Sequence, residues 1–160
     1  APHGLAPYGL EALDVLRLEK GYVIVGQDTD GACTPDDLGM GRMVGARKGD
    51  FVGARSLRLP HLAAPGRRQL VGLRPRGRGA LEEGAQIVAA PSPAPGAHAL
   101  GHVTSVRASP TLGRVIALAL IENGRARLGE TLHATTMDGT TAVEVVAPVF
   151  YDPDGSRLHV

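Results

Sequence analysis

Two histidines and one acidic turn are the residues whose spacing first suggests metal chemistry. His98 and His102 lie four positions apart, the separation that places two zinc ligands on one face of a helix. They follow a proline-rich stretch and enter a predicted strand, however, where four residues span about 13 Å. The turn 28–31, Asp-Thr-Asp-Gly, resembles the start of a calcium loop, but its twelfth position, which requires a glutamate, is Gly39. The sequence therefore predicts no metal site.

Nucleophilic and phosphate-binding chemistry have equally little support. Cys33 is the only cysteine and has no histidine near it in the sequence, so a spare small residue is favoured over a nucleophile. The glycine-rich runs at 39–41 and 76–79 fit the spacing of no nucleotide-binding loop. No residue is expected to be catalytic. A single cysteine also excludes an internal disulfide and fits a reducing compartment, which predicts a cytoplasmic location.

Charge is segregated along the 160 residues, although the formal net charge is only +1. Residues 1–41 hold seven acids against two bases, residues 42–80 hold ten bases against one acid, and residues 81–160 hold five bases against eight acids. The basic middle segment is therefore the one expected to face an anion or a partner. Its arginine cluster at 67–78 contains no aromatic residue to stack on bases, so a partner-facing or solvated loop is favoured over nucleic-acid binding.

The first part of the chain, residues 1–66, predicts mixed α and β structure. A helix is expected over 10–20 and ends at Gly21, with apolar positions that include Leu10, Leu13 and Leu16. Residues 22–25 are apolar and mostly β-branched, which predicts a short buried strand or extended segment. Two further elements are expected: a strand over 42–47 and a short helix over 51–59.

The second part, residues 67–160, predicts a barrel. Short strands bounded by turn residues are expected at 69–73, 86–89, 100–107, 113–121, 131–137 and 140–148. Asp138-Gly139 is a two-residue hairpin signal between the last two, and the three prolines within 90–96 predict an exposed loop. Strands at this spacing favour a closed antiparallel barrel. The longest apolar run, 115–121, is far shorter than the roughly 20 residues of a membrane span, so we expect a soluble protein without a membrane partner.

Several short motifs occur in the same order as in the glycine-cleavage T-protein (aminomethyltransferase) family, which the chain resembles over nearly its whole length. Segments 9–22, 26–30 and 34–35 are similar to the later half of the family's folate-binding domain, and more motifs follow at 50–53, 68–73, 101–105, 109–112 and 148–150. Within the family, EKGYVIVGQDTDG at 19–31 and the ending PVFYDPDGSRLHV are most similar to the C-terminal end of α subunits of heterotetrameric sarcosine oxidases.

This resemblance implies an α+β fold, in which 1–66 is the C-terminal part of a folate-binding domain and 67–160 is the family's C-terminal antiparallel β-barrel domain. It also implies a fragment, because the catalytic aspartate and most pterin-binding residues belong to an upstream half. Tetrahydrofolate would there capture the one-carbon unit of oxidised sarcosine as 5,10-methylenetetrahydrofolate. The implied partners are that upstream half and the other oxidase subunits, while FMN, FAD and NAD would bind outside this chain.

Other identities remain open beside this one. A subunit-interaction module without catalysis, or a fragment of an aminomethyltransferase or of a dimethylglycine oxidase-like enzyme, would share these motifs. A start at Ala1 rather than methionine fits either processing or a piece of a longer chain.

From the matched motifs we expect five residues to contribute to cofactor binding: Arg17, Glu19, Tyr22, Gln27 and Asp28. Each has a structural alternative: local helix pairs for the first two, a core position for the tyrosine, and stabilisation of the turn for the last two. A further group is expected to shape a barrel loop rather than to contact a ligand: Thr104, Ser105, Ser109 and Pro110.

Two positions depart from the family pattern. Leu13 stands where aminomethyltransferases commonly carry an arginine for the folate glutamate carboxylate, and an apolar side chain cannot make that charge-assisted bond. Arg42 stands where many relatives have tryptophan. Arg17 or the basic segment 42–80 is the candidate replacement for the carboxylate contact.

Overall fold

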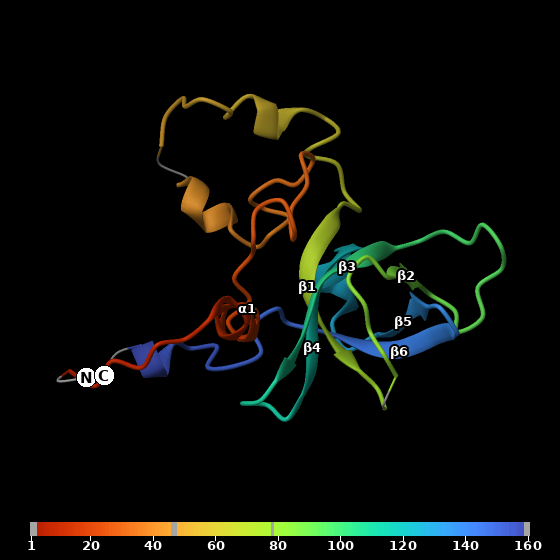
Figure 1. Ribbon diagram of the computed structural model, residues 1–160. Coiled ribbons are helices and arrows are strands. Elements are labelled where there is room, and N and C mark those ends of the chain that lie inside the picture. The colour runs from red at the N-terminus through yellow and green to blue at the C-terminus, as the bar shows by residue number, and fades with distance from the viewer. Residues whose placement is uncertain (1–2, 46–47, 78, 159–160) are drawn as a thin grey trace.

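The computed structural model describes residues 3–45, 48–77 and 79–158 (Figure 1). An α-helix, α1 (Leu10–Glu19), precedes a long irregular stretch, and six strands follow: β1 (Arg68–Pro75), β2 (Gln86–Val88), β3 (Gly101–Ser109), β4 (Arg114–Glu122), β5 (Thr131–Thr136) and β6 (Gly139–Val146). Four short 3₁₀ helices complete the structure: η1 (Gly41–Val44), η2 (Ser56–Arg58), η3 (Gly124–Arg127) and η4 (Ser156–Leu158). No helix within these ranges has the length and hydropathy to cross a membrane.

The six strands close into an antiparallel barrel in the order β1-β4-β3-β2-β5-β6, with β6 paired back to β1. This confirms the predicted barrel and the α+β class. Because side chains alternate across a strand, every second residue points inward. The apolar core of the interior is aliphatic: Val71, Leu73, Ile87, Val103, Ala117, Ala119, Ile121, Leu132, Ala134, Val143 and Val145.

Strand β4 is buried on both faces, which explains its uninterrupted apolar sequence. Ala117, Ala119 and Ile121 point into the barrel. The intervening residues form a second core on its outer side, together with Leu18 of α1: Ile116, Leu118 and Leu120. A strand covered on both faces needs apolar residues at successive positions rather than at alternate ones. The longest apolar run of the sequence thus lies in the strand that separates the barrel interior from the core under α1.

Helix α1 ends where the sequence predicts, at Gly21, and the geometry shows why. The Gly21 N–H donates to the Leu18 carbonyl (3.0 Å) and the Tyr22 N–H donates to the Arg17 carbonyl (2.9 Å), the paired bonds of a Schellman cap. This cap requires positive φ, here +69°, and a Cβ at Gly21 would lie 2.6 Å from the Pro148 carbonyl oxygen. Glycine therefore satisfies both the turn and the close passage of the C-terminal segment.

The C-terminal segment ties α1 to the barrel. The backbone N–H groups of Phe150 and Tyr151 both donate to the Glu19 carbonyl at 2.9 Å. Lys20 Nζ donates to the Asp152 carbonyl at 2.5 Å and lies 3.2 Å from its carboxylate. In Figure 1 this blue segment runs beside the red helix. The helix is therefore held by a strap on one side and by β4 on the other.

Of the two alternatives predicted for 22–25, a short buried strand or an extended segment, the buried strand is wrong. Tyr22 is 57% exposed and Val25 is 86% exposed, and no strand is present there. The N–H groups of Gln27 and Asp28 bond back to the Ile24 carbonyl at 3.1 and 2.9 Å, so the backbone closes a local turn instead of pairing with another strand. The β-branched composition signals a strand only where a neighbouring edge is available.

Two other predicted elements differ in kind. At 42–47 the described residues form the 3₁₀ helix η1 instead of a strand, because local bonds such as Met43 N–H to the Met40 carbonyl (2.9 Å) close the chain on itself; residues 46–47 lie outside the described ranges. Residues 51–59 contain only the short η2, after Gly53 with φ +94°, a value incompatible with a continuous helix.

The last hairpin is shifted by one residue from its prediction. The two-residue loop is Met137–Asp138, and Gly139 already pairs with Thr136. The observed pairing places Leu132 opposite Val143, and both side chains are buried in the barrel interior. The local signal therefore predicts the hairpin but not the exact position of its loop.

Gly101 marks the closest approach of β3 to β4, and its replacement is expected to destabilise the barrel. A Cβ at this position would collide with the Leu120 carbonyl oxygen. We predict that Gly101→Ala lowers the free energy of unfolding by about 1–3 kcal/mol, the usual cost of overpacking. Chemical denaturation measures the change. Gly31→Ala is the matched control, since its Cβ would enter open space, and an equal loss in both variants would contradict the prediction.

Candidate functional site

Three of the five predicted cofactor residues meet in one buried polar cluster between α1 and β3. Asp28 is fully buried, and its Oδ2 accepts a bond from Arg17 Nη1 at 2.6 Å. Gln27 Nε2 donates to Ser105 Oγ at 3.1 Å and to the Thr104 carbonyl at 3.3 Å. The expectation that Thr104 and Ser105 shape a barrel loop is wrong, since both lie within β3. Their hydroxyls, which are buried, serve the cluster.

The Arg17 guanidinium is committed to this cluster. Besides its ion pair with Asp28, its Nη2 donates to Ser105 Oγ at 2.8 Å and its Nη1 to the Tyr22 carbonyl at 3.3 Å. A local helix pair is also present, with 3.9 Å between Arg17 Nε and Asp14 Oδ1. Only 8% of the side chain is exposed. Both structural alternatives for Arg17 and Asp28, the helix pair and the stabilised turn, are thus present in the geometry.

Glu19 points to a different place from the other predicted residues. Its carboxylate accepts a 2.5 Å bond from Ser109 Oγ, and the residue is 2% exposed. It borders a hollow of about 340 Å³ between α1, the β3–β4 turn and the C-terminal segment, together with Leu16, Lys20, Thr111, Tyr151, Asp152 and Arg157. Glu19 and Ser109 join the end of α1 to the end of β3.

The Tyr22 side chain lies on the exposed loop after α1, apart from the Asp28 cluster and from the Glu19–Ser109 contact. It is 57% exposed, and the side chains of Ile24 and Val25 in the same loop are 36% and 86% exposed. The positions that depart from the family pattern are also at the surface: Leu13 is 44% exposed on α1, and Arg42 is exposed in η1. The structure therefore brings Arg17, Gln27 and Asp28 together and leaves the side chains of Glu19 and Tyr22 outside this cluster.

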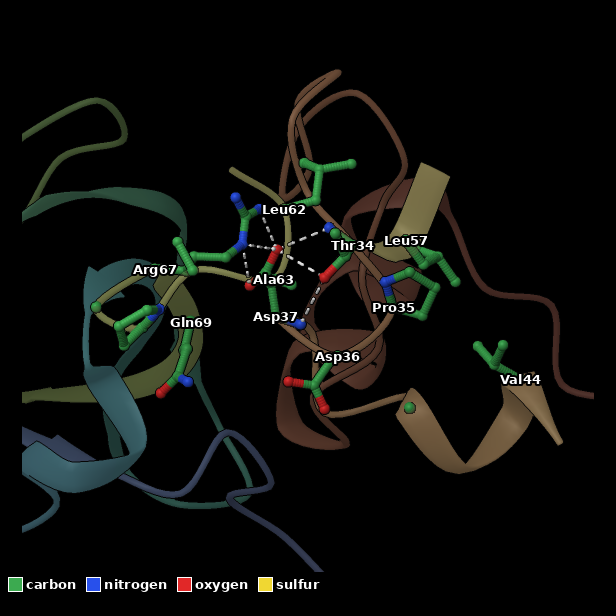
Figure 2. A pocket seen from close by; sticks show the side chains of 14 residues that line it. Thr34, Pro35, Asp36, Asp37, Val44, Leu57, Leu62, Ala63, Arg67 and Gln69 are labelled. Atoms are coloured by element: carbon green, nitrogen blue, oxygen red, sulfur yellow. Dashed lines mark hydrogen bonds and ion pairs between the residues drawn. The ribbon is translucent and has the colours of Figure 1, made fainter. Parts of the chain in front are cut away.

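A pocket of about 380 Å³ lies elsewhere, where residues 34–66 meet the start of β1, and none of the five predicted residues lines it. Figure 2 shows Leu57 and Val44 on one side and Asp37 with Arg67 on the other. Arg67 Nε donates to the two carboxylate oxygens of Asp37 at 2.9 and 3.1 Å, and its Nη groups donate to the carbonyls of Ala32 and His61.

Thr34 and Asp37 form a reciprocal capping pair beside this arginine. The Thr34 N–H and hydroxyl donate to Asp37 Oδ2 at 2.8 and 2.9 Å, and the Asp37 N–H donates to Thr34 Oγ1 at 3.3 Å. Threonine followed by proline and two acids is a local turn signal, but nothing near it in the sequence points to Arg67, thirty residues away. The pocket is thus walled by contacts that fasten residues 32–37 and 61 to β1.

The pKa of Asp37 is held below its usual value by these bonds. Burial by itself raises the pKa, but the hydrogen bonds from Arg67 and Thr34 stabilise the carboxylate more strongly. Burial raises the pKa of the nearby Cys33 thiol, which disfavours the reactive thiolate. No group of His, Cys, Asp and Glu side chains in the described ranges is arranged to hold a metal ion.

The lowered pKa of Asp37 predicts acid-dependent stability. A carboxylate whose pKa is depressed on folding stabilises the fold above its unfolded pKa of about 3.9, and this contribution is lost as the pH falls through the folded pKa. Asp37→Asn should lower the free energy of unfolding at neutral pH by about 1–3 kcal/mol and flatten its fall below about pH 4. Denaturant titrations at several pH values measure both effects.

Asp50→Asn is the control for this substitution. Asp50 pairs with Arg55 at 3.3 Å, but both side chains are largely exposed, so its loss should change stability by less than about 0.5 kcal/mol. Equal effects of the two variants, or an unchanged pH profile in Asp37→Asn, would contradict the assignment.

Two domains of one family match the chain. The glycine cleavage T-protein C-terminal barrel domain matches residues 68–152, more than half of the chain, and the GCVT N-terminal domain matches residues 1–48. A solved structure, the glycine cleavage system aminomethyltransferase T from Bartonella henselae, superposes with a TM-score of 0.74 at 25% identity and covers 89% of this chain and 38% of its own.

Relatives of two kinds are similar over almost the whole chain. Sarcosine oxidase subunit alpha from Rhizobium meliloti (strain 1021) is 45% identical over 161 residues, which cover 99% of this chain but 16% of the relative. The corresponding subunit from Corynebacterium sp. (strain U-96) is 47% identical over 157 residues, again 16% of its length. Aminomethyltransferase from Thermosynechococcus vestitus is 39% identical over 148 residues, or 38% of its length. The chain therefore belongs to the glycine cleavage T-protein family, as its ordered motifs predict, and is similar to a short part of sarcosine oxidase α subunits.

Proposed function

We propose that this chain forms one wall of a tetrahydrofolate site in a sarcosine oxidase α subunit and that an upstream part of the same subunit completes the site. The observation that carries the proposal is a set of exposed apolar side chains on α1 and the loop after it. Its members and their exposed fractions are Leu10 (81%), Leu13 (44%), Leu16 (51%), Tyr22 (57%) and Val25 (86%). Large apolar side chains that gather at the surface in this way are typical of a region that another domain or a ligand covers.

The similarity to longer relatives supports an upstream partner domain. The chain spans 16% of the sarcosine oxidase α subunits and 38% of an aminomethyltransferase, and the GCVT N-terminal domain matches only residues 1–48. We take residues 1–66 as the end of that domain and 67–160 as the barrel domain. The remainder of the N-terminal domain is the natural occupant of the apolar face.

Residues of the loop fit the chemistry of a folate. The Tyr22 ring and Val25 present flat and apolar surface to a pterin or benzoyl ring, and the Gln27 amide lies at the edge of the same loop. Arg17, Glu19 and Asp28 would support the site without contacting the folate, because their polar atoms are bonded within the chain. Tetrahydrofolate, when bound, supplies the nitrogen nucleophiles that take up a one-carbon unit as 5,10-methylenetetrahydrofolate.

The oxidation itself belongs to other parts of the enzyme in this proposal. Sarcosine would lose two electrons at a flavin outside this chain, and the resulting imine carbon would pass to tetrahydrofolate with release of glycine. FMN, FAD and NAD would accordingly bind elsewhere in the α subunit or in the other subunits, which are the further partners. A cytoplasmic location stays a prediction from the single cysteine.

A second candidate function is a subunit-interaction module without a ligand. It is favoured by the exposed basic residues of the arm 41–58: Arg42, Lys48 and Arg58 form no ion pair within the described ranges, and Met43 and Val52 are almost fully exposed beside them. A surface of mixed basic and apolar side chains suits an acidic protein partner. This candidate differs from the first in requiring no folate.

Calorimetry with tetrahydrofolate separates the two candidates. We expect weak or no binding by this chain alone and clear binding by a version extended at its amino terminus with the preceding part of the N-terminal domain. Equal, tight binding by both would contradict the shared site. An extended chain that folds and binds other oxidase subunits, but not tetrahydrofolate, would favour the interaction module instead.

Leu13 offers a test of how the folate tail is bound. In the extended chain, Leu13→Arg should restore the charge-assisted bond to the glutamate carboxylate and raise the affinity for tetrahydrofolate about tenfold or more. The gain should be absent with tetrahydropteroate, which lacks the glutamate. Leu10→Arg is the control, because it adds the same charge one turn earlier on α1; an equal gain there would indicate nonspecific attraction instead.

A further inference from the structure

The fully buried Asp28 carboxylate accepts four hydrogen bonds from three separate segments. Its Oδ2 accepts from Arg17 Nη1 at 2.6 Å and from the Ile24 N–H at 2.9 Å. Its Oδ1 accepts from the hydroxyls of Thr104 and Ser105 at 2.5 and 2.6 Å. Both oxygens are therefore saturated, which is the condition under which a buried charge is tolerated.

A β-bulge in β3 makes this arrangement possible. In a regular strand, consecutive side chains point to opposite faces, so Thr104 and Ser105 would not reach one acceptor. The register of β3 on β4 shifts between Val103 and Ser105, which leaves Thr104 as the extra residue. Such bulges re-aim side chains beside functional sites. Here the bulge aims two consecutive hydroxyls at Asp28.

The same carboxylate fixes the shape of the loop that follows α1. The Ile24 N–H donates to the Asp28 side chain while the Asp28 N–H donates to the Ile24 carbonyl, so the two residues are bonded in both directions. The Arg17 guanidinium, held by Asp28, also donates to the Tyr22 carbonyl. The loop backbone is thus bonded at Tyr22 and Ile24, although the side chains of Tyr22 and Val25 are exposed.

We propose that Asp28 is a positioning residue, which with Arg17 and Thr104 holds the loop 22–25 in the conformation that a folate requires. The inference rests on the proposed function. An exposed tyrosine and valine on a locked loop contribute little to the stability of this chain, whereas a preformed wall removes the ordering cost of binding. Asp28 acts through the loop and makes no contact with the ligand.

Two variants of the extended chain test the positioning role. Asp28→Asn removes the charge that balances Arg17, and it should lower the affinity for tetrahydrofolate at least about tenfold. Because the substitution leaves the buried Arg17 charge paired only with Asp14, at 3.9 Å, it also risks misfolding. Thr104→Val is the second variant: it removes one donor without disturbing a charge, and we expect a loss of affinity of about threefold or more. Thr104→Ser, which keeps the donor, should restore most of it.

Thr141→Val is the matched control, since Thr141 is equally buried and its hydroxyl donates a 2.8 Å bond to the Ala80 carbonyl in another part of the barrel. It should cost similar stability but no folate affinity. Hydrogen exchange should show faster exchange of the 22–28 amides in Asp28→Asn and Thr104→Val, with β1 and β4 unchanged.

The outcomes separate this inference from the proposed function. If the unsubstituted extended chain does not bind tetrahydrofolate, the proposed function fails and the positioning role falls with it. If that chain binds and Thr104→Val or a folded Asp28→Asn binds equally well, only the positioning role is overturned. An affinity loss of the same size in Thr141→Val would also overturn it, since the effect would then follow stability alone.

Discussion

A single buried carboxylate, that of Asp28, joins the two halves of this chain. It connects α1, the loop after it and the bulge of β3, segments that are up to 88 residues apart in sequence through the Arg17 contact to Ser105. A buried ion pair is costly to desolvate, and it is retained only where further hydrogen bonds satisfy the remaining lone pairs. Here the four bonds come from three backbone segments, α1, the loop after it and β3, so the charge specifies one relative placement of helix and barrel.

Strand β4 supplies the apolar contacts between the barrel and α1, beside the polar contacts of Asp28. Its inward residues fill the barrel, and its outward residues, with Leu18, make the core under α1. The hydrophobic contact alone is nondirectional and would tolerate sliding of the helix along the strand. The directional bonds of Asp28 on β3 and of Glu19 on Ser109 remove that freedom. Stability and geometry therefore come from neighbouring but different sets of residues.

The outward side of α1 follows from the same arrangement. Leu18 is buried against the barrel, whereas Leu10, Leu13 and Leu16 remain exposed. The sequence pattern of an amphipathic helix is thus satisfied only when a second body covers these leucines. In the proposed function the upstream part of the subunit is that body, and the exposed side chains of the loop 22–25 lie at its border.

Local sequence determined much of the fold. The barrel, the extent of α1 and its stop at Gly21 were predictable, because strand alternation and the glycine cap depend on residues close in the chain, and the ordered motifs identified the family. Tertiary structure alone decided the rest. The run 22–25 has the composition of a buried strand but no edge to pair with, and Arg17, Glu19 and Asp28 look like surface charges until β3 brings Ser105, Ser109 and Thr104 to them. Arg67 likewise finds Asp37 thirty residues away. A charged side chain is buried only where hydrogen-bonding partners surround it. Here those partners come from distant parts of the sequence, so no local pattern encodes them.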